Sequence, residues 1–406
     1  MKHHQILVAD KLLFILALAV LASALIGFGI SRTAAPKTKT PNVVFIQWWE
    51  DYLEEGVLLE LIREFENTHG GIKIVLNHQS YEDLYRELPG AGENPPGKTV
   101  TGDLIALDTL WIPEIQKKET LEFQWFRNLQ QYSLENPIIS FVNVFYYNVE
   151  ILKEAGFSHP PKNRGEFLNF ARAVTSEEEG RWALSMGRNC SRGIYDDVFP
   201  WIWAAGAELI KNGKPALNSR SVTESLSFLA SLESNGLIVP GGSDADAGKK
   251  LEDFISGRAV FMIAPARDIK YVRECMGDDA FSVTSIPIPD NYAGKTYYAS
   301  MEWALGINAE SAYKEEARLF AEFITEKAQT LSEKFMSGNR TQDLFYSKVD
   351  DISIAGESAR DFTALPWAQL EEIFREELDS LFAGQITAAE AGAAIQKRWE
   401  DLILSL

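Results

Sequence analysis

The chain has 406 residues, of which 46% are hydrophobic, 24% charged and 11% aromatic, and its formal net charge is −19. This composition is that of an ordinary folded protein and excludes a largely disordered chain. The acidic balance excludes a nucleic-acid-binding function, because binding phosphates requires clustered Lys and Arg side chains.

An uncharged apolar run opens the chain. It extends over Leu12–Ile30, is about 19 residues long and therefore able to cross a bilayer, and follows a basic flank with Lys2 and Lys11. The pattern predicts that residues 1–30 are a signal peptide or an N-terminal membrane helix that anchors the protein, and both alternatives stay open. Residues 31–41 then form a linker. We expect the protein in the periplasm or on the outer face of the cytoplasmic membrane.

The next part of the chain alternates between apolar runs and amphipathic segments. Apolar residues from Val57 to Phe65 lie at helical spacing, and Gly70-Gly71 ends this helix. The alternation predicts a parallel sheet with helices on both faces. The expected elements are a strand from Asn42, a helix over 54–66, a strand over 72–76, a helix over 81–88 and a strand over 102–108.

The remaining pattern continues the α/β character, and the length after the leader suggests two domains of about 150 residues each. We predict strands over 138–147, 258–264, 280–286 and 302–308. Helices are predicted over 149–155, 164–175, 219–235 and 251–256, and from Glu310 almost to Leu406, with breaks near Gly338, Gly356, Pro366 and Gly384.

Short motifs occur along the chain in a characteristic order and spacing. They are Trp48–Trp49, Gly71–Ile74, Leu107–Glu114, Phe145–Gly156, Phe199–Gly206, Phe254–Ile263 and Trp303–Asn308. In this order the chain resembles the extracellular solute-binding proteins of ABC importers, in the carbohydrate-binding cluster that includes maltose-binding protein.

The resemblance implies a two-lobed periplasmic-binding-protein fold, with hinge crossovers and a ligand cleft between the lobes. The N-terminal lobe would comprise residues 42–140 plus 265–309, and the C-terminal lobe residues 141–264 plus 310–406. The implied function is that of a non-enzymatic receptor that closes on a carbohydrate or polyol and delivers it to the transmembrane subunits of an ABC transporter, with no cofactor. A ligand-sensing subunit for a membrane receptor and an extracytoplasmic glycoside hydrolase are the alternatives.

Sugar recognition needs flat apolar faces for ring C–H groups and planar polar groups that pair with hydroxyls. Because successive side chains of a strand alternate faces, one of the first two tryptophans below is expected in the core. Trp182 and Trp399 are expected to be packing residues. The candidate ligand-binding residues are Trp48, Trp49, Glu50, Asp108, Trp111, Asn143, Trp201, Trp203, Arg267, Glu302, Trp303 and Trp367.

Two departures from the family pattern bear on the ligand. Met301-Glu302-Trp303 stands where relatives often have Gly-Gly-Trp, which puts larger side chains into the cleft. Ala264-Pro265-Ala266-Arg267 stands where many have Gly-Pro-Trp, which replaces a stacking platform with a cation. An anionic or aminated solute therefore stays open as the ligand.

Other patterns in the sequence do not predict a function. Residues 92–99 match the P-loop motif, but a helix precedes it, a strand follows it, and Pro95 and Pro96 remove two backbone donors. The carboxylate pairs at 50–51, 196–197 and 278–279 are expected on a solvated acidic surface. No His/Cys cluster has metal-ligand spacing. Neither Cys190 nor Cys275 lies near the leader, which excludes a lipid-modified cysteine, and both are expected to be free and buried.

Overall fold

The structure is a computed structural model that describes residues 40–88 apart from 52 and 54, 102–112, 115, 139–327 apart from 191, 291 and 293–297, 331, and 365–405. The predicted leader and the P-loop-like motif lie outside these residues. Among the described residues no helix combines the length and apolar character that a membrane crossing needs. The signal peptide or anchor therefore stays a prediction.

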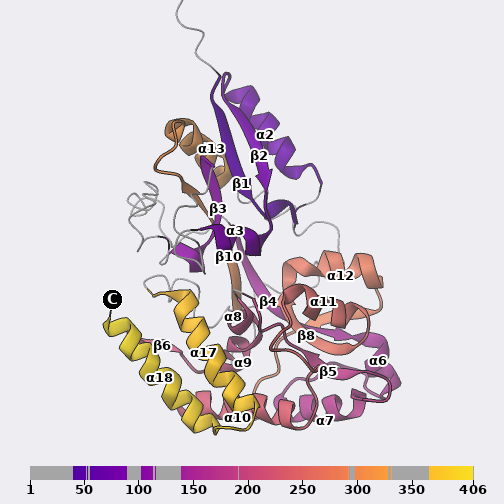
Figure 1. Cartoon of the computed structure of the whole chain (residues 1–406). Coiled ribbons are helices and arrows are strands. Elements are labelled where there is room, and N and C mark those ends of the chain that lie inside the picture. Colours follow the sequence, from indigo (N-terminus) through magenta and orange to yellow (C-terminus); the bar gives the residue numbers. More distant parts are fainter. Residues whose placement is uncertain are drawn as a thin grey trace, which may run out of the picture. The chain divides into compact units, whose positions relative to one another are not determined.

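One mixed sheet runs through the described fold in the strand order β2-β1-β3-β10-β4-β8-β5, with β9 paired to β4 (Figure 1). β1 pairs in parallel with β2 and β3, and β5 pairs in parallel with β8. The other pairs are antiparallel, so the predicted parallel sheet is wrong in its centre. The strands are β1 (Asn42–Gln47), β2 (Lys73–His78), β3 (Leu104–Asp108), β4 (Ile139–Asn148), β5 (Trp182–Ser185), β8 (Ala259–Pro265), β9 (Phe281–Thr284) and β10 (Tyr298–Ile307), with the small hairpin β6 (Ile210–Lys211) and β7 (Lys214–Pro215) apart.

Most predicted segments agree with the observed helices and strands to within a few residues, most clearly α10 and β8, whereas β5, β6, β7, α8, α9 and α12 were not predicted. The helices are α2 (Val57–Thr68), α3 (Tyr81–Glu87), α6 (Val149–Glu154), α7 (Arg164–Val174), α8 (Gly193–Asp197), α9 (Phe199–Trp203), α10 (Arg220–Ser234), α11 (Ala247–Ile255), α12 (Ile269–Met276), α13 (Lys314–Glu326), α17 (Trp367–Phe382) and α18 (Ala388–Leu404). Three short 3₁₀ helices follow strand ends: η1 (Trp49–Asp51), η2 (Thr109–Trp111) and η3 (Ala266–Asp268).

Helix α13 belongs with the first part of the chain. Its Phe320 ring lies 5.8 Å from the Phe45 ring of β1 and 5.0 Å from the Phe65 ring of α2. Figure 1 shows α13 at the same end of the fold as β1, β2 and α2, whereas α17 and α18 lie with α10. The apolar face of α13 is thus buried against β1 and α2, whereas the sequence places residues 310–406 in the C-terminal lobe, and the lobe boundaries stay a prediction.

The segment after β8 packs against the later elements of the chain and not against β1 or α2. Ile269 and Val272 of α12 share a buried apolar cluster with Phe254 of α11 and Met262 of β8. The helix that follows residue 265, where the sequence predicts the return to the N-terminal lobe, therefore packs with α11 and β8. We use "first lobe" for β1–β3, α2, α3 and α13, and "second lobe" for β5, β8, β9, α6–α12, α17 and α18; β4 and β10 join them.

Both cysteines are free, as predicted. Cys190 is partly buried, whereas Cys275 is exposed on α12, so the expectation that both thiols are buried is wrong for Cys275. Cys275 follows Val272 by three positions and faces solvent while Val272 faces the core.

Candidate functional site

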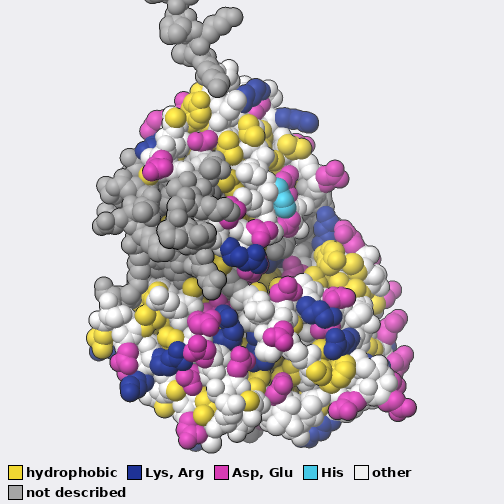
Figure 2. All heavy atoms as spheres, viewed as in Figure 1, with side chains coloured by type: hydrophobic (Ala, Val, Ile, Leu, Met, Phe, Trp, Pro, Cys, Tyr) yellow, Lys and Arg dark blue, Asp and Glu magenta, His cyan; other side chains and the backbone are white. Residues whose placement is uncertain are grey.

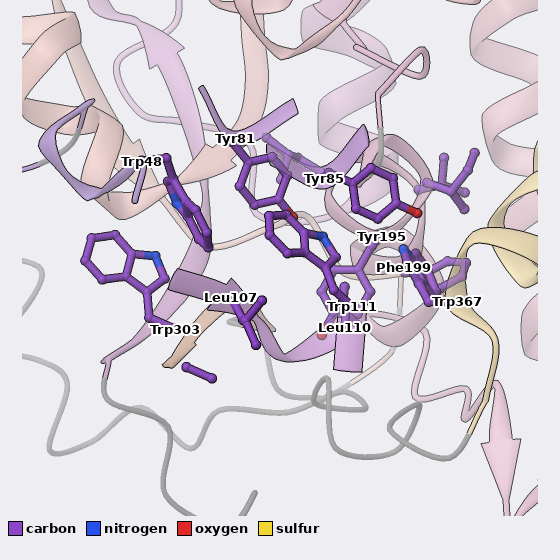
Figure 3. Packing of buried hydrophobic residues seen from close by; sticks show 14 of the residues in the cluster. Trp48, Tyr81, Tyr85, Leu107, Leu110, Trp111, Tyr195, Phe199, Trp303 and Trp367 are labelled. Atoms are coloured by element: carbon purple, nitrogen blue, oxygen red, sulfur yellow. The ribbon is translucent and has the colours of Figure 1, made fainter. Parts of the chain in front are cut away.

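Trp48, Trp111 and Trp303 gather where β1 and β3 end (Figure 3), and Trp49 stacks on Trp303. Since parallel strands end at the same edge of a sheet, Trp48 and Trp49 after β1 meet Trp111 after β3. The Trp49 and Trp303 rings stack with centroids 4.5 Å apart, and the Trp48 and Trp111 centroids are 5.0 Å apart. Both Trp48 and Trp49 are buried, because the chain turns into η1 after Gln47 and the alternation of a strand no longer applies. Burial of both therefore agrees with a core position for at least one of them, and their role in ligand binding stays a prediction.

The indole nitrogens of this cluster are unusual. Nε1 of Trp48, Trp49 and Trp111 is buried and has no hydrogen-bond partner among the described residues. A buried donor without a partner costs about 1–3 kcal/mol. Three such donors at one strand edge make this a place where a polar molecule with acceptor oxygens would be stabilised.

A buried ion pair lies beside the tryptophans and joins the two lobes. Nη1 of Arg192, just before α8, lies 2.7 Å from Oδ2 of Asp108 at the end of β3, and the two side chains are 5% and 0% exposed. The Tyr81 hydroxyl donates to the same carboxylate at 2.8 Å, and the backbone N–H of Leu110 donates to it at 3.0 Å. Asp108, a predicted site residue, is thus fully engaged within the protein.

The same arginine is held from the second-lobe side. Nε of Arg192 lies 3.2 Å from Asp196, whose other oxygen accepts a 2.9 Å hydrogen bond from Nδ2 of Asn143. Burial would lower the pKa of Arg192, but the Asp108 and Asp196 carboxylates raise it well above its usual value. Burial would raise the pKa of Asp196, but Arg192 and Asn143 hold it below its usual value. The guanidinium and the Asp196 carboxylate are therefore both charged.

Asp196 and its neighbour correct one expectation. The side chains of Asp196 and Asp197 are 13% and 1% exposed, so this pair is not a solvated acidic surface. Asp197 lies 2.8 Å from Nζ of Lys250, which also donates to the Ile263 carbonyl. Burial raises the pKa of Asp197 to about 6, against the opposing effect of Lys250.

The second-lobe tryptophans have different surroundings. Trp201 packs in the core, with its ring centroid 5.8 Å from that of Phe145. Trp203 and Trp367 are also buried and contact Tyr195 edge-on at 5.2 and 5.5 Å. Tyr195 carries the Arg192 guanidinium 4.7 Å above its ring. The structure thus favours packing for Trp201, whereas Trp203 and Trp367 support the ion-pair centre. Trp399 is buried in the core, as predicted, and Trp182 is partly buried under Arg258.

A hollow of about 320 Å³ lies between elements of the two lobes. Its first-lobe wall comes from the segment after β1, and its second-lobe wall from α11, η3 and α12. Figure 2 shows acidic and basic side chains intermixed on the face that bears α11 and α12. The lining residues are Asp51, Leu53, Leu251, Arg267, Asp268, Lys270, Tyr271 and Glu274.

Among the described lining residues, Arg267 is the one predicted site residue. Its side chain is 7% exposed, and its Nε lies 3.6 Å from Asp268, whose pKa burial raises despite the opposing effect of Arg267. Glu50 is exposed next to Asp51 and is held by Gln47, which donates to it at 2.7 Å. Glu302 lies in β10 opposite Ser140, but its side chain lies outside the described part of the chain.

Sequence reasoning missed several residues of this region. Tyr81 and Arg192 carried no motif, although both hold Asp108. The signal that could have found the α12 residues is their spacing. Residues three, four and seven positions after Arg267 lie on one side of a helix, and these are Lys270, Tyr271 and Glu274. In the described part of the chain no group of three or more His, Cys, Asp or Glu side chains is arranged to hold a metal ion.

The comparison with protein families decides the identity of the fold. The profile of the family described as bacterial extracellular solute-binding protein matches residues 46–331. The chain belongs to this family. Membership fits a two-lobed α/β fold in which the hollow and the ion-pair centre lie between the lobes, and the family is extracellular.

Solved structures of solute-binding proteins are similar over nearly the whole chain. A maltose-bound protein from T. maritima is 19% identical, covers 90% of this chain and 100% of its own, and has a TM-score of 0.65. A ribitol complex from Agrobacterium radiobacter is 17% identical, with coverages of 89% and 98% and a TM-score of 0.65. An alpha-D-tagatose-bound protein from Thermotoga lettingae is 18% identical, with coverages of 89% and 100% and a TM-score of 0.68. These likenesses establish the fold.

Proposed function

We propose that this solute-binding protein is a non-enzymatic receptor that captures a sugar or polyol between its lobes and delivers it to an ABC importer. Family membership supports the receptor role. Structures of the same fold bound to maltose, ribitol and tagatose support the ligand class. The apolar run at residues 12–30 supports export, with the protein either released by cleavage or tethered by the linker at residues 31–41.

The observation that carries the proposal is the hollow between η1 and α12. Its volume is near the lower end of small-molecule sites, which span about 300–1,000 Å³. Charged groups pair with hydroxyls, while the Tyr271 ring and two leucines offer apolar surface to ring C–H groups. A hollow with walls from both lobes also gives a ligand contacts that exist only when the lobes are together, which closure requires.

Proposed lobe boundaries follow from the packing described above. The first lobe comprises the described residues of 42–112 together with 308–327, and the second comprises the described residues of 149–290 together with 365–405. The strands β4 and β10 pass between them and act as the hinge, because they are the two long strands whose pairing runs across both groups. Trp48, Trp49, Trp111 and Trp303 then support the first-lobe wall, and Nε1 of Trp48, Trp49 and Trp111 is buried there without a hydrogen-bond partner among the described residues.

A thermal-shift screen tests the proposal. The full chain, kept in a mild detergent, is heated with neutral sugars, polyols, sugar acids, amino acids and polyamines. A ligand present at about 100 times its dissociation constant adds about 2.7 kcal/mol, which raises the melting midpoint visibly. We expect sugars or polyols to raise it, and Tyr271→Ala to reduce the effect while Tyr292→Ala, at another exposed tyrosine, does not.

Three results would overturn parts of the proposal. A response only to amino acids or polyamines would remove the ligand class. Conversion of the bound sugar into product would indicate a glycoside hydrolase instead of a receptor. Normal uptake of the labelled ligand in cells that lack the protein would indicate a sensing subunit, because an importer needs its receptor.

A further inference from the structure

Arg192 lies between two carboxylates that belong to different lobes. Its Nη1 lies 2.7 Å from Asp108 of the first lobe, and its Nε lies 3.2 Å from Asp196 of the second lobe. The planar guanidinium has separate N–H groups for two such partners, which the ammonium group of a lysine does not hold in fixed directions. We use "interlobe latch" for these three residues.

Each side of the interlobe latch also has partners in its own lobe. Asp108 accepts hydrogen bonds from the Tyr81 hydroxyl at 2.8 Å and from the Leu110 backbone N–H at 3.0 Å, both in the first lobe. Arg192 has Asp196 beside it in the second lobe. Separation of the lobes at the 2.7 Å contact therefore leaves neither charge without a partner, so this contact is able to open and close.

Asp196 opposes the contact between Arg192 and Asp108. Burial would raise the pKa of Asp196, but Arg192 and a 2.9 Å hydrogen bond from Asn143 hold it below its usual value, so Asp196 is charged. Burial raises the pKa of Asp108, Arg192 opposes this, and the like charge of Asp196 adds to the increase. The contact thus brings two negative charges around one positive charge, where little water screens them.

We propose that the interlobe latch closes the receptor without ligand and that Asp196 keeps this closure reversible. The contact between Asp108 and Arg192 stabilises the closed arrangement. The repulsion between Asp108 and Asp196 destabilises it, because these two carboxylates come close only when the lobes are together. Asp196 is therefore a positioning residue that sets how readily the empty receptor opens. This inference rests on the proposed lobe boundaries and not on the ligand class.

The neighbouring Asp197 offers a matched comparison, because its ion pair lies within one lobe. Nζ of Lys250 lies 2.8 Å from Asp197 and also donates to the Ile263 carbonyl. The backbone N–H of Gly187 donates to the other oxygen of Asp197 at 2.8 Å. All of these groups belong to the second lobe, so opening of the lobes does not change the pair.

Single-molecule energy transfer in the full chain, kept in mild detergent without ligand, tests the inference. The exposed Cys275 of α12 takes one dye, and Leu59→Cys on α2, where the side chain is 47% exposed, takes the other. Cys190 stays unlabelled, because burial raises the pKa of its thiol well above the usual value. The ratio of closed to open dwell times then reports the equilibrium between the two lobes.

The two carboxylate variants are expected to move this ratio in opposite directions. Asp108→Asn should lower it at least about fivefold, because Arg192 loses its partner in the first lobe. Asp196→Asn should raise it at least about fivefold, because the repulsion between the lobes is removed while Arg192 keeps Asp108. Asp197→Asn should leave the ratio unchanged, because it disrupts a pair within the second lobe.

Each result supports or overturns the inference. A ratio that falls in Asp196→Asn, as it does in Asp108→Asn, would mean that Asp196 merely holds the arginine in place. A ratio that neither variant changes would mean that the interlobe latch does not control opening, and the sugar receptor would still be decided by the thermal-shift screen. Arg192→Lys keeps a cation beside both carboxylates and therefore serves if a neutral variant fails to fold. Its ratio should lie between those of wild type and Asp108→Asn, and a ratio equal to that of wild type would contradict the bridging role of the guanidinium.

Discussion

Glu371 of α17 is a buried carboxyl group that is 1% exposed. Its side chain accepts a 3.0 Å hydrogen bond from the Ile194 backbone N–H at the start of α8. Burial raises the pKa of Glu371 to about 8, against the opposing effects of Arg375 and Arg192. The folded protein therefore holds the proton of this group more tightly than the unfolded chain does.

The sign of the resulting pH dependence follows from the raised pKa. Below pH about 4.5 the carboxyl is neutral in both states, so folding carries no ionisation penalty. As pH rises from about 4.5 to about 8, the unfolded chain ionises first and stability falls. The glutamine of Glu371→Gln does not titrate. We therefore expect the free energy of unfolding of this variant, relative to wild type, to increase by about 3 kcal/mol from pH 5 to pH 8 in urea unfolding.

The neighbouring Glu372 provides the control for this prediction. It is 56% exposed and pairs with Arg375 at 3.0 Å. The stability change in Glu372→Gln is expected to stay below about 0.5 kcal/mol at every pH. A wild-type stability that runs parallel to that of Glu371→Gln from pH 5 to pH 8 would contradict the buried neutral carboxyl.

At this scale the sequence identifies residues whose chemistry is local. Asp108 and Asn143 were predicted from strand ends and Arg267 from its motif, and all three lie at polar positions between the lobes. Arg192 was missed because its role depends on Asp108, which is 84 positions earlier in the chain. Trp201 was selected by residue type, and its burial against Phe145 could not be read from spacing alone.

The assignment of α13 to the first lobe gives a prediction at the scale of elements. Phe320 is fully buried and lies between Phe45 and Phe65. Phe320→Ala should cost about 3–5 kcal/mol, because truncating a core phenylalanine leaves a cavity. In hydrogen exchange we expect faster exchange in α13, α2 and β1, with α17 and α18 unchanged.

The matched control truncates a phenylalanine in the second lobe. Phe374 of α17 is fully buried, and its ring lies 5.1 Å from that of Phe199 and 6.2 Å from that of Trp399. Phe374→Ala should accelerate exchange in α17, α18 and α9 and spare α2. The same exchange pattern in both variants would mean that the lobes unfold as one unit and that the proposed boundaries have no energetic meaning.

The positions of helices and strands along the chain were easier to predict than the order in which the strands pair. The apolar periodicity that predicted α2 is borne out by five buried positions, from Val57 to Phe65. The sheet order was not accessible in the same way, because β10 inserts antiparallel between β3 and β4 from far along the chain. Local alternation of strand and helix predicts parallel pairs between strands that are close in sequence. It contains no information about a strand from a distant part of the chain that pairs between them.

For the whole molecule, the Asp108–Arg192 pair links the lobes without a ligand. Its charges are buried and closely paired at 2.7 Å, and removing one partner of such a pair costs about 3–5 kcal/mol because the other is left uncompensated. Arg192→Gln should therefore both lower stability and favour separation of the lobes. We expect a larger radius of gyration in X-ray scattering of the ligand-free variant than of wild type.

Arg86→Gln is the control, because Arg86 forms an ion pair with Asp83 whose side chains are 67% and 63% exposed. It should change stability by less than about 1 kcal/mol and leave the scattering unaltered. If Arg192→Gln has the dimensions of wild type and loses less than 1 kcal/mol, the ion pair does not hold the lobes together.

A double-mutant cycle separates the pair from its surroundings. Asp108→Asn together with Arg192→Gln removes both charges, so no uncompensated charge is left buried, and we expect the double variant to be more stable than the sum of the single changes by at least about 1 kcal/mol. We also expect ligand to reduce the radius of gyration of Arg192→Gln more than that of wild type. The pair already holds most wild-type molecules closed, so ligand can close only the few that remain open. Additive stability changes with equal contraction would mean that closure depends on the ligand alone.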